Sequence, residues 1–172
     1  MIEIRLPQER DDVSGFDCGE PNLNLFLKQY AKQNQFKPYI GTIYIARYDN
    51  KIIGYASVSS SSIRVDELGK LTAKKSPQYP LPILRLTRLV VDKRYRQRGI
   101  GKALLKWILK LALKQKEQFG CFGLVVDAKE ESVAFYEQYG FEGFAIHAGE
   151  LDIRPYAQSM FLTIKTIESG SE

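Results

Sequence analysis

The feature that most constrains the fold of this chain is the segment 86–105, which reads LTRLVVDKRYRQRGIGKALL. A buried-strand pattern leads into a basic turn, two glycines and the start of an amphipathic helix pattern. A helix start presents unpaired backbone N–H groups and the positive end of the helix dipole. Gly99 and Gly101 let a ligand approach the backbone closely. Three basic side chains add positive charge: Arg96, Arg98 and Lys102. The segment therefore predicts a site for a phosphate or pyrophosphate group.

A simpler interpretation is that the two glycines only allow a sharp strand-to-helix turn, but it leaves the arginines of the turn without a role. Two nucleotide-binding motifs do not fit. A Walker A loop requires Ser or Thr after its lysine, whereas Lys102 is followed by Ala103. A dinucleotide fingerprint requires a third glycine where Leu104 stands. The sequence gives little support to nucleotide hydrolysis.

Positive charge is concentrated in one region. The net charge is +5, and residues 93–116 hold nine basic and no acidic residues, against 16 basic and 20 acidic residues elsewhere. Four of the basic residues recur every fourth position: Lys102, Lys106, Lys110 and Lys114. Such a surface suits a polyanionic partner. A solvated helix face is an equally good interpretation.

The remaining patterns predict an α/β chain with one mixed central sheet flanked by helices. We expect helices over Asn22–Lys32, from the glycine turn to about Phe119, and over Ser132–Tyr139. We expect strands over Ile2–Arg5, Thr42–Arg47, Ile52–Ser59, Ile83–Val91, Cys121–Val126, Phe141–Phe144 and Ser159–Ile164. Asp49-Asn50-Lys51 predicts a hairpin, and the prolines of Ser76–Pro82 predict a constrained loop. We expect one domain, 1–172, with a frayed tail at 168–172.

The cysteines and the apolar runs indicate the compartment. Cys18 and Cys121 have no Cys or His neighbour at zinc-ligand spacing, so we expect no metal. Two cysteines are too few for a disulfide framework, so we expect a reduced, cytoplasmic setting. No uncharged run approaches the length of about 18 apolar residues that a spanning helix needs, so no membrane is expected as a partner. The first residues also lack the apolar core of a signal peptide.

Two motifs resemble those of the GNAT acetyltransferases. Arg96–Gly101 is similar to the family's acyl-CoA-binding turn, Arg/Gln-x-x-Gly-x-Gly/Ala, and Ala134–Phe141 is similar to its late helix and following strand. The resemblance covers about residues 40–165 and implies the GNAT (acyl-CoA N-acyltransferase) fold with acetyl-CoA as co-substrate. It implies that the end of the preceding strand pairs with the pantetheine arm: Leu89, Val90 and Val91. It implies that the turn holds the pyrophosphate: Arg96, Gln97, Arg98, Gly99, Ile100, Gly101 and Lys102.

The same resemblance implies that Tyr136 is the general acid that protonates the sulfur of CoA. A phenol with an ordinary pKa of about 10 keeps its proton near neutral pH. The alternative is that Tyr136 is simply a packed core residue. His147, the single histidine, is a weak candidate for a general base. An α-amino acceptor with a pKa of about 7.7–8.0 needs little help from a base, so we expect water to be sufficient.

The first 45 residues indicate one branch of the GNAT family, the toxins of bacterial type II toxin–antitoxin systems. The similarity to these toxins lies in Gly15–Glu20 and the apolar positions that follow it. Two later segments are also similar to them: Tyr79–Pro82 and Asp127–Glu131. Thr87-Arg88 departs from this pattern, because relatives often have small apolar residues there. The resemblance implies an aminoacyl-tRNA acceptor, blocked translation, a small DNA-binding antitoxin as partner and a possible homodimer. An enzyme that acetylates a small amine or a protein N-terminus stays an alternative, as does a nucleic-acid-binding module without catalysis.

Overall fold

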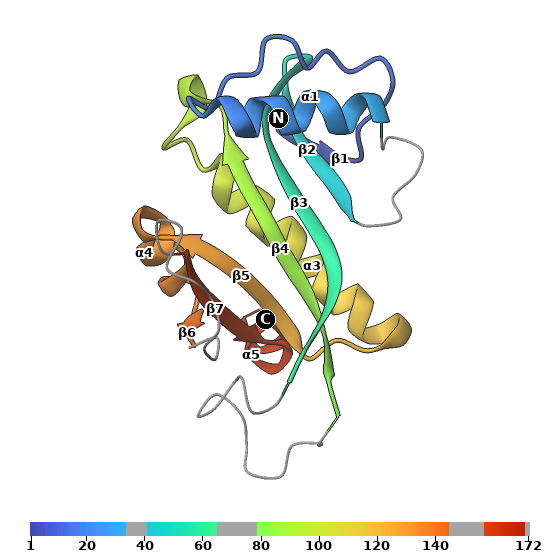
Figure 1. Ribbon diagram of the computed structural model, residues 1–172, viewed down its shortest axis with the longest axis vertical. Helices are drawn as coiled ribbons and strands as arrows, with labels where there is room; N and C mark the ends of the chain where they lie inside the picture. Colours follow the sequence, from blue (N-terminus) through green and yellow to red (C-terminus); the bar gives the residue numbers. More distant parts are fainter. Residues whose placement is uncertain (34–40, 65–78, 145–156, 171–172) are drawn as a thin grey trace. The chain divides into compact units, whose positions relative to one another are not determined.

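The computed structural model of the protein describes residues 1–33, 41–64, 79–144 and 157–170. The described strands form one seven-stranded sheet in the order β1-β2-β3-β4-β5-β7-β6 (Figure 1). β4 and β5 are parallel, whereas β1–β2, β2–β3, β5–β7 and β6–β7 are antiparallel. The mixed α/β fold predicted from the sequence is confirmed.

The elements follow the predicted order with changed boundaries, and one α-helix and two short 3-10 helices are additional. The strands are β1 (Glu3–Arg5), β2 (Thr42–Tyr48), β3 (Lys51–Ile63), β4 (Leu81–Val91), β5 (Gly123–Lys129), β6 (Glu142–Gly143) and β7 (Ala157–Thr163). The α-helices are α1 (Pro21–Gln33), α3 (Ile100–Phe119), α4 (Val133–Glu137) and α5 (Ile164–Ser169). Two short 3-10 helices are η2 (Lys93–Tyr95) and η3 (Glu130–Ser132).

The chain forms two compact units, one of residues 1–59 and 87–108 and the other of residues 60–86 and 109–172. In unit 1 the hairpin of β2 and β3 turns at Asp49 and Asn50, whose φ angles of 48° and 59° are both left-handed. This conformation matches the twist of the strands, so the predicted hairpin is confirmed. The prediction of a single domain stays a prediction.

The core of unit 1 lies between α1 and the sheet. Leu27 of α1 and Tyr55 of β3 are almost fully buried there, and Phe16 joins them with its ring centroid 5.7 Å from that of Tyr55. The Tyr55 hydroxyl donates a hydrogen bond to the Leu23 carbonyl of α1 over 2.8 Å. Its polar end is thereby satisfied inside an apolar layer. This packing fixes α1 on one face of the N-terminal strands.

In unit 2 the pairing of β5 with β7 builds a second core, to which Val125, Phe144 and Phe161 belong. Phe122 packs at its edge, with its ring stacked on Phe161 at 5.9 Å between centroids.

No helix in the parts that the structure describes is long and apolar enough to cross a membrane.

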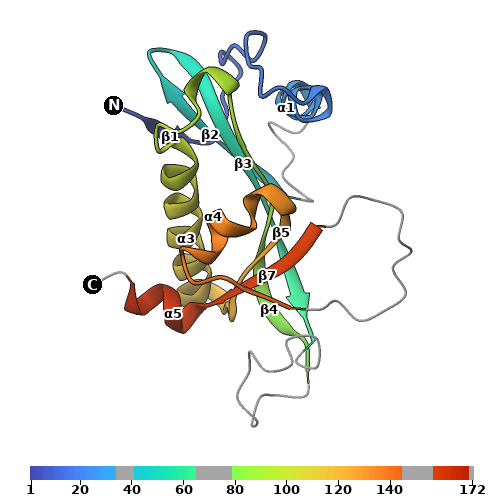
Figure 2. The ribbon, with the colours of Figure 1, turned by 90° about the vertical axis from the view of Figure 1, so that its left-hand side faces the viewer.

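Two predictions at the ends of elements are wrong. β4 begins at Leu81, so Pro82 lies in the strand rather than in the predicted loop, of which residues 76–78 lie outside the described residues. Proline has no N–H to donate, but here its carbonyl is the group that forms the hydrogen bond, accepting from the Phe122 N–H over 2.7 Å. Pro82 is therefore tolerated near the start of the strand. The final strand ends at Thr163 rather than at Ile164, and Ile164 begins α5, a helix that the sequence did not predict (Figure 2). The Thr163 side chain accepts from the Thr166 N–H at 3.2 Å and caps this helix. The frayed tail expected at 168–172 stays a prediction.

We predict that Gly123→Ala destabilises the protein by about 2–4 kcal/mol, because a methyl group there would overlap the Leu162 carbonyl and lie 2.6 Å from the Phe161 ring. Thermal unfolding measures the effect as a drop in Tm of roughly 5 °C or more. Gly15→Ala is the matched control, since nothing lies within 4 Å of its added carbon. Equal Tm values for the two variants would contradict the described packing of β5 on β7.

Candidate active site

The candidate site begins where β4 ends at Val91 and the chain turns into α3. After Asp92 and η2, the residues Arg96–Gly99 form a turn, and the helix starts at Ile100. Gln97 and Gly99 both have left-handed backbone angles, with φ of 60° and 79°. For glycine this costs little, whereas for glutamine it costs about 1–2 kcal/mol. The turn therefore carries backbone strain at Gln97.

The start of α3 is open to an anion. The first helical hydrogen bond runs from the Ala103 N–H to the Gly99 carbonyl over 3.0 Å. The N–H groups of Ile100, Gly101 and Lys102 consequently precede any acceptor within the helix. Gly99 has no side chain to cap them, and no atom lies within 4 Å of the place where its Cβ would be. The described residues thus fit the phosphate site that the sequence predicts.

The three predicted basic residues of the turn are placed differently. Arg98 and Lys102 are exposed, and the Arg98 guanidinium lies 5.5 Å from the centroid of the Tyr95 ring. Arg96 donates from Nη2 to the Cys18 carbonyl, so part of its binding capacity is used within the protein. Arg96 is itself exposed, and Arg98 and Lys102 are exposed cations beside the helix start for which no hydrogen bond to a described residue is found. The role of Arg96 as an anion ligand stays a prediction.

The predicted pantetheine-pairing residues end β4. Val90 is buried in the core of unit 1, while Leu89 and Val91 are half-buried. Gly54 of β3 lies close by: a Cβ there would be 2.9 Å from the Val90 carbonyl and 3.2 Å from Ile100 and Leu104. Glycine at 54 therefore lets β3 and the start of α3 pack closely beside the end of β4.

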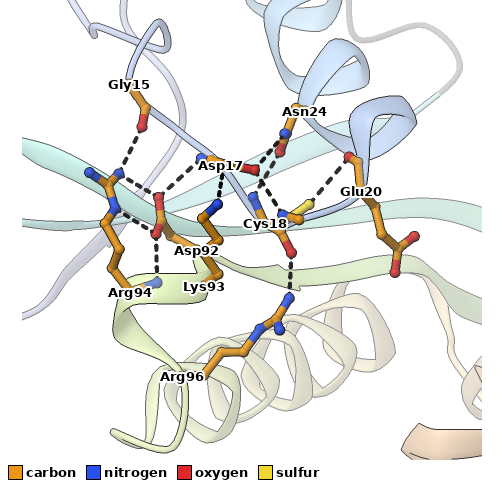
Figure 3. A network of polar contacts seen from close by, with 10 residues as sticks. Gly15, Asp17, Cys18, Glu20, Asn24, Asp92, Lys93, Arg94 and Arg96 are labelled. Carbon is orange, nitrogen blue, oxygen red and sulfur yellow. Dashed lines mark hydrogen bonds and ion pairs between the residues drawn. The ribbon is translucent and has the colours of Figure 1, made fainter.

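Asp92 is the centre of a polar network that the sequence did not predict (Figure 3). Its side chain is fully buried and accepts from the Arg94 backbone N–H, from Arg94 Nε at 2.9 Å and from Arg94 Nη2 at 2.7 Å. The same carboxylate accepts from the Asp17 N–H at 3.1 Å, and Arg94 Nη2 also donates to the Gly15 carbonyl. Burial alone raises the pKa of Asp92, but the hydrogen bonds and charge of Arg94 outweigh it and lower the pKa below its ordinary value.

Asp17 continues this network into α1 (Figure 3). Its carbonyl accepts from the Lys93 N–H over 2.9 Å, and its carboxylate pairs with Lys93 Nζ at 2.7 Å. The carboxylate also accepts from the Gly19 N–H and from Asn24 Nδ2. Hydrogen bonds from Lys93 lead the effects that hold the pKa of Asp17 well below its ordinary value. The segment 15–24 is thereby fixed to the turn that precedes α3.

Tyr136 lies in unit 2, on α4. The residue is 4% exposed, and its ring contacts Phe135 and Phe141 edge-on, with centroids 5.1 and 5.4 Å apart. Its carbonyl accepts from the Phe141 N–H just after Gly140, whose φ of 93° ends the helix turn. Burial raises the pKa of Tyr136 above its ordinary value, so the phenol keeps its proton near neutral pH.

Of the side-chain polar atoms that the structure describes, only Trp107 Nε1 is fully buried without a partner.

Other predicted residues contribute less. Burial raises the pKa of the Cys121 thiol, and the thiol donates to the Gly123 carbonyl, which makes it a poor nucleophile. The described residues contain no group of His, Cys, Asp and Glu side chains that could hold a metal. His147 lies outside the described residues.

Comparison with known proteins identifies the class. Residues 40–143 match the acetyltransferase (GNAT) domain. That is more than half of the chain, and the chain belongs to the GNAT acetyltransferase family. The predicted GNAT fold and acetyltransferase class are confirmed.

The relatives include toxins. The tRNA-acetylating toxin of Mycobacterium tuberculosis is 28% identical over 136 residues, which are 78% of this chain and 80% of the relative. The structure of AtaT complexed with acetyl-methionyl-tRNAfMet has a TM-score of 0.85 and 26% identity and covers 100% of both chains. A tyrosine-to-phenylalanine mutant of the toxin AtaT, bound to the C-terminus of the antitoxin AtaR and acetyl-CoA, has a TM-score of 0.75 and 25% identity, with 98% of this chain and 97% of that chain covered.

We predict that Gln97→Gly stabilises the protein by about 0.5–1 kcal/mol, because relief of the left-handed strain exceeds the entropy that glycine adds to the unfolded chain. Urea unfolding measures this as a higher midpoint. Gly99→Ala should act in the opposite direction, since its φ of 79° strains any side chain. A Gln97→Gly variant less stable than wild type would show that the Gln97 side chain makes a net favourable interaction.

We predict that Asp92→Asn destabilises the protein at pH 7 by about 1–3 kcal/mol, because a buried charged acceptor of several hydrogen bonds is lost. The folded-state pKa of Asp92 is below its unfolded value, so its contribution is complete above about pH 4 and is lost as the pH falls through the folded-state pKa. Urea unfolding at pH 7 and pH 3 should therefore show a smaller difference between the two proteins at pH 3. A difference that does not change with pH would contradict an ionised Asp92.

Proposed function

We propose that this protein transfers the acetyl group of acetyl-CoA to the amino group of aminoacyl-tRNA and so blocks translation. The observation that carries the proposal is the turn at 96–102, where open helix amides and exposed cations meet, in a chain similar to tRNA-acetylating toxins over most of its length. The similarity to AtaT complexed with acetyl-methionyl-tRNAfMet supports the acceptor class.

Acetyl-CoA, when bound, supplies the acetyl group as a thioester. We propose that the amides at the start of α3 hold its pyrophosphate, with Arg98 and Lys102 as the nearest cations. Backbone groups of Leu89, Val90 and Val91 would hold the pantetheine arm. The AtaT structure that contains acetyl-CoA supports this choice of co-substrate. The proposed binding residues thus follow one another along a single strand–turn–helix segment.

Tyr136 is the proposed general acid. Its apolar surroundings disfavour the phenolate, so the residue holds a proton that it can give to a leaving thiolate. The acceptor itself needs little activation, because an α-amino group with a pKa of about 7.7–8.0 is partly neutral near physiological pH. Water therefore suffices as the base, and no protein residue is needed in this role.

Partners and compartment follow from the acceptor. The exposed lysines of α3 suit the phosphate backbone of tRNA: Lys102, Lys106, Lys110 and Lys114. A charged-tRNA substrate places the reaction in the cytoplasm. The complex of AtaT with AtaR supports a small DNA-binding antitoxin as the partner that keeps this chain inactive. A homodimer stays a prediction.

The acceptor is tested by incubating the purified chain with labelled acetyl-CoA and either a charged-tRNA pool or a panel of free amines and peptide N-termini. We expect label on the amino acid of charged tRNA and none on uncharged tRNA. Label on the free amines alone would overturn the tRNA assignment and support a small-amine or protein N-terminus acetyltransferase.

We predict that Tyr136→Phe lowers kcat by about 10²–10⁴-fold, because the proton donor is lost while the ring stays packed. Calorimetric binding of acetyl-CoA should be unchanged, and growth arrest on expression should disappear. Tyr139→Phe is the matched control: the Tyr139 ring also contacts Phe135 edge-on, with centroids 5.3 Å apart, but Tyr139 is more exposed than Tyr136. A Tyr136→Phe variant with the kcat of Tyr139→Phe would exclude Tyr136 as the acid.

A further inference from the structure

Arg88 of β4 lies against the aromatic core of unit 1. Its guanidinium carbon is 3.7 Å from the centroid of the Phe26 ring of α1, and that ring stacks on Tyr55 with centroids 6.1 Å apart. Residues 88 and 90 share one face of the strand, and Val90 belongs to the same core. Arg88 is thus a half-buried cation at the edge of an apolar layer.

Among the described residues, the N–H groups of Arg88 have no hydrogen-bond acceptor. The hydroxyls of Tyr55 and Tyr30 in the same layer are satisfied, since they donate to the carbonyls of Leu23 and Gly41 over 2.8 and 3.1 Å. Within the described ranges 1–33, 41–64, 79–144 and 157–170, by contrast, the Arg88 guanidinium has its ring contact and no hydrogen bond or ion pair. Arg85, on the same strand, pairs with Asp127 at 3.1 Å. A half-buried guanidinium without a described acceptor can bind an anionic ligand without losing a contact to a described residue.

The geometry of the stack selects the kind of anion. A guanidinium packed flat on a ring keeps its N–H donors at its edge, where they can bind two oxygens of a phosphate side by side. Lys102 and Lys106 are exposed on α3, which covers the other face of the sheet in unit 1, so they raise the positive charge of the unit without contacting Arg88 (Figure 2). Arg88 also directly precedes Leu89–Val91, the proposed pantetheine-binding residues, on the strand that leads to the turn.

We propose that Arg88 binds a backbone phosphate near the aminoacylated end of the tRNA acceptor and so favours nucleic-acid acceptors over small amines. This inference rests on the proposed function. Arg88 is a substrate-binding residue in this proposal, and the Phe26 ring, whose centroid is 3.7 Å from the guanidinium carbon, supports its side chain. It takes no part in proton transfer, so its loss should weaken acceptor binding without slowing the chemical step.

The test compares two acceptors that carry the same kind of amine. One is aminoacyl-tRNA, and the other is puromycin, an aminoacyl nucleoside that has a free α-amino group and no phosphate. We expect Arg88→Ala to raise KM for aminoacyl-tRNA by about 10- to 100-fold with kcat nearly unchanged, because a charge-assisted pair is lost. KM for puromycin should change by less than about 2-fold, and Arg88→Lys should fall between Arg88→Ala and wild type for tRNA.

Two further variants separate binding from folding. Arg85→Ala removes a neighbouring arginine that already has a partner, and both acceptors should react with it as with wild type. Phe26→Leu keeps an apolar side chain but removes the ring, and it should raise KM for tRNA by a smaller factor than Arg88→Ala. Melting temperature and acetyl-CoA binding, measured for each variant, show whether the fold is kept.

The outcomes are distinct. Equal losses for tRNA and puromycin, or no loss for tRNA, would overturn the role of Arg88. An acidic peptide serves as a third acceptor, and a loss confined to this peptide would also overturn the role of Arg88 and would assign the site to a protein carboxylate. Failure of the wild-type chain to acetylate any charged tRNA would overturn the proposed function itself. This outcome depends on the wild-type protein alone, so it is distinguishable from a failure of the role of Arg88.

Discussion

The geometry of the candidate site depends on one buried carboxylate. Asp92 follows the last residue of β4 and accepts hydrogen bonds from Arg94 on one side and from the Asp17 backbone on the other. A buried charge is stable only when it is paired and hydrogen-bonded, and here both conditions are met by residues that also define the turn. The Asp92 backbone N–H donates to the Ile53 carbonyl of β3 over 2.9 Å. Asp92 therefore joins the sheet, the turn and the N-terminal segment.

This anchor explains how a strained turn persists. Gln97 and Gly99 occupy left-handed conformations, and such residues are stable only where the surrounding structure holds both ends of the segment. Before the turn, Asp92 and Arg94 hold the chain; after it, Ile100 and Leu104 are buried in the core. The result is a helix start whose amides face outward rather than being capped by a side chain. The strained backbone conformation thereby produces a turn that is suited to bind an anion.

The hydrophobic patterns were sufficient to predict most elements, because α1 and α3 each have an apolar stripe with a helical period, and central strands such as β3 and β5 are runs of consecutive buried residues. The turn could be located as well, since glycines and basic residues at a helix start have a direct physical meaning. The network around Asp92 could not, because its partners Gly15 and Asp17 lie far away in sequence and their pairing depends on the fold. Two further contacts could not be predicted for the same reason. Arg96 donates to the Cys18 carbonyl and Arg88 lies over the Phe26 ring, and in both cases the partner comes from the N-terminal segment. Helix α5 was missed because its capping residue, Thr163, ends a strand.

The central claim is that the start of α3 binds the phosphates of the coenzyme. Calorimetric titration of the purified chain with acetyl-CoA and with acetyl-pantetheine tests it most directly, because the two ligands share the thioester arm and differ in the phosphates and nucleoside. The account predicts that acetyl-CoA binds about 100-fold more tightly or better, with an affinity that falls as salt is added. Equal affinities for the two ligands would contradict it.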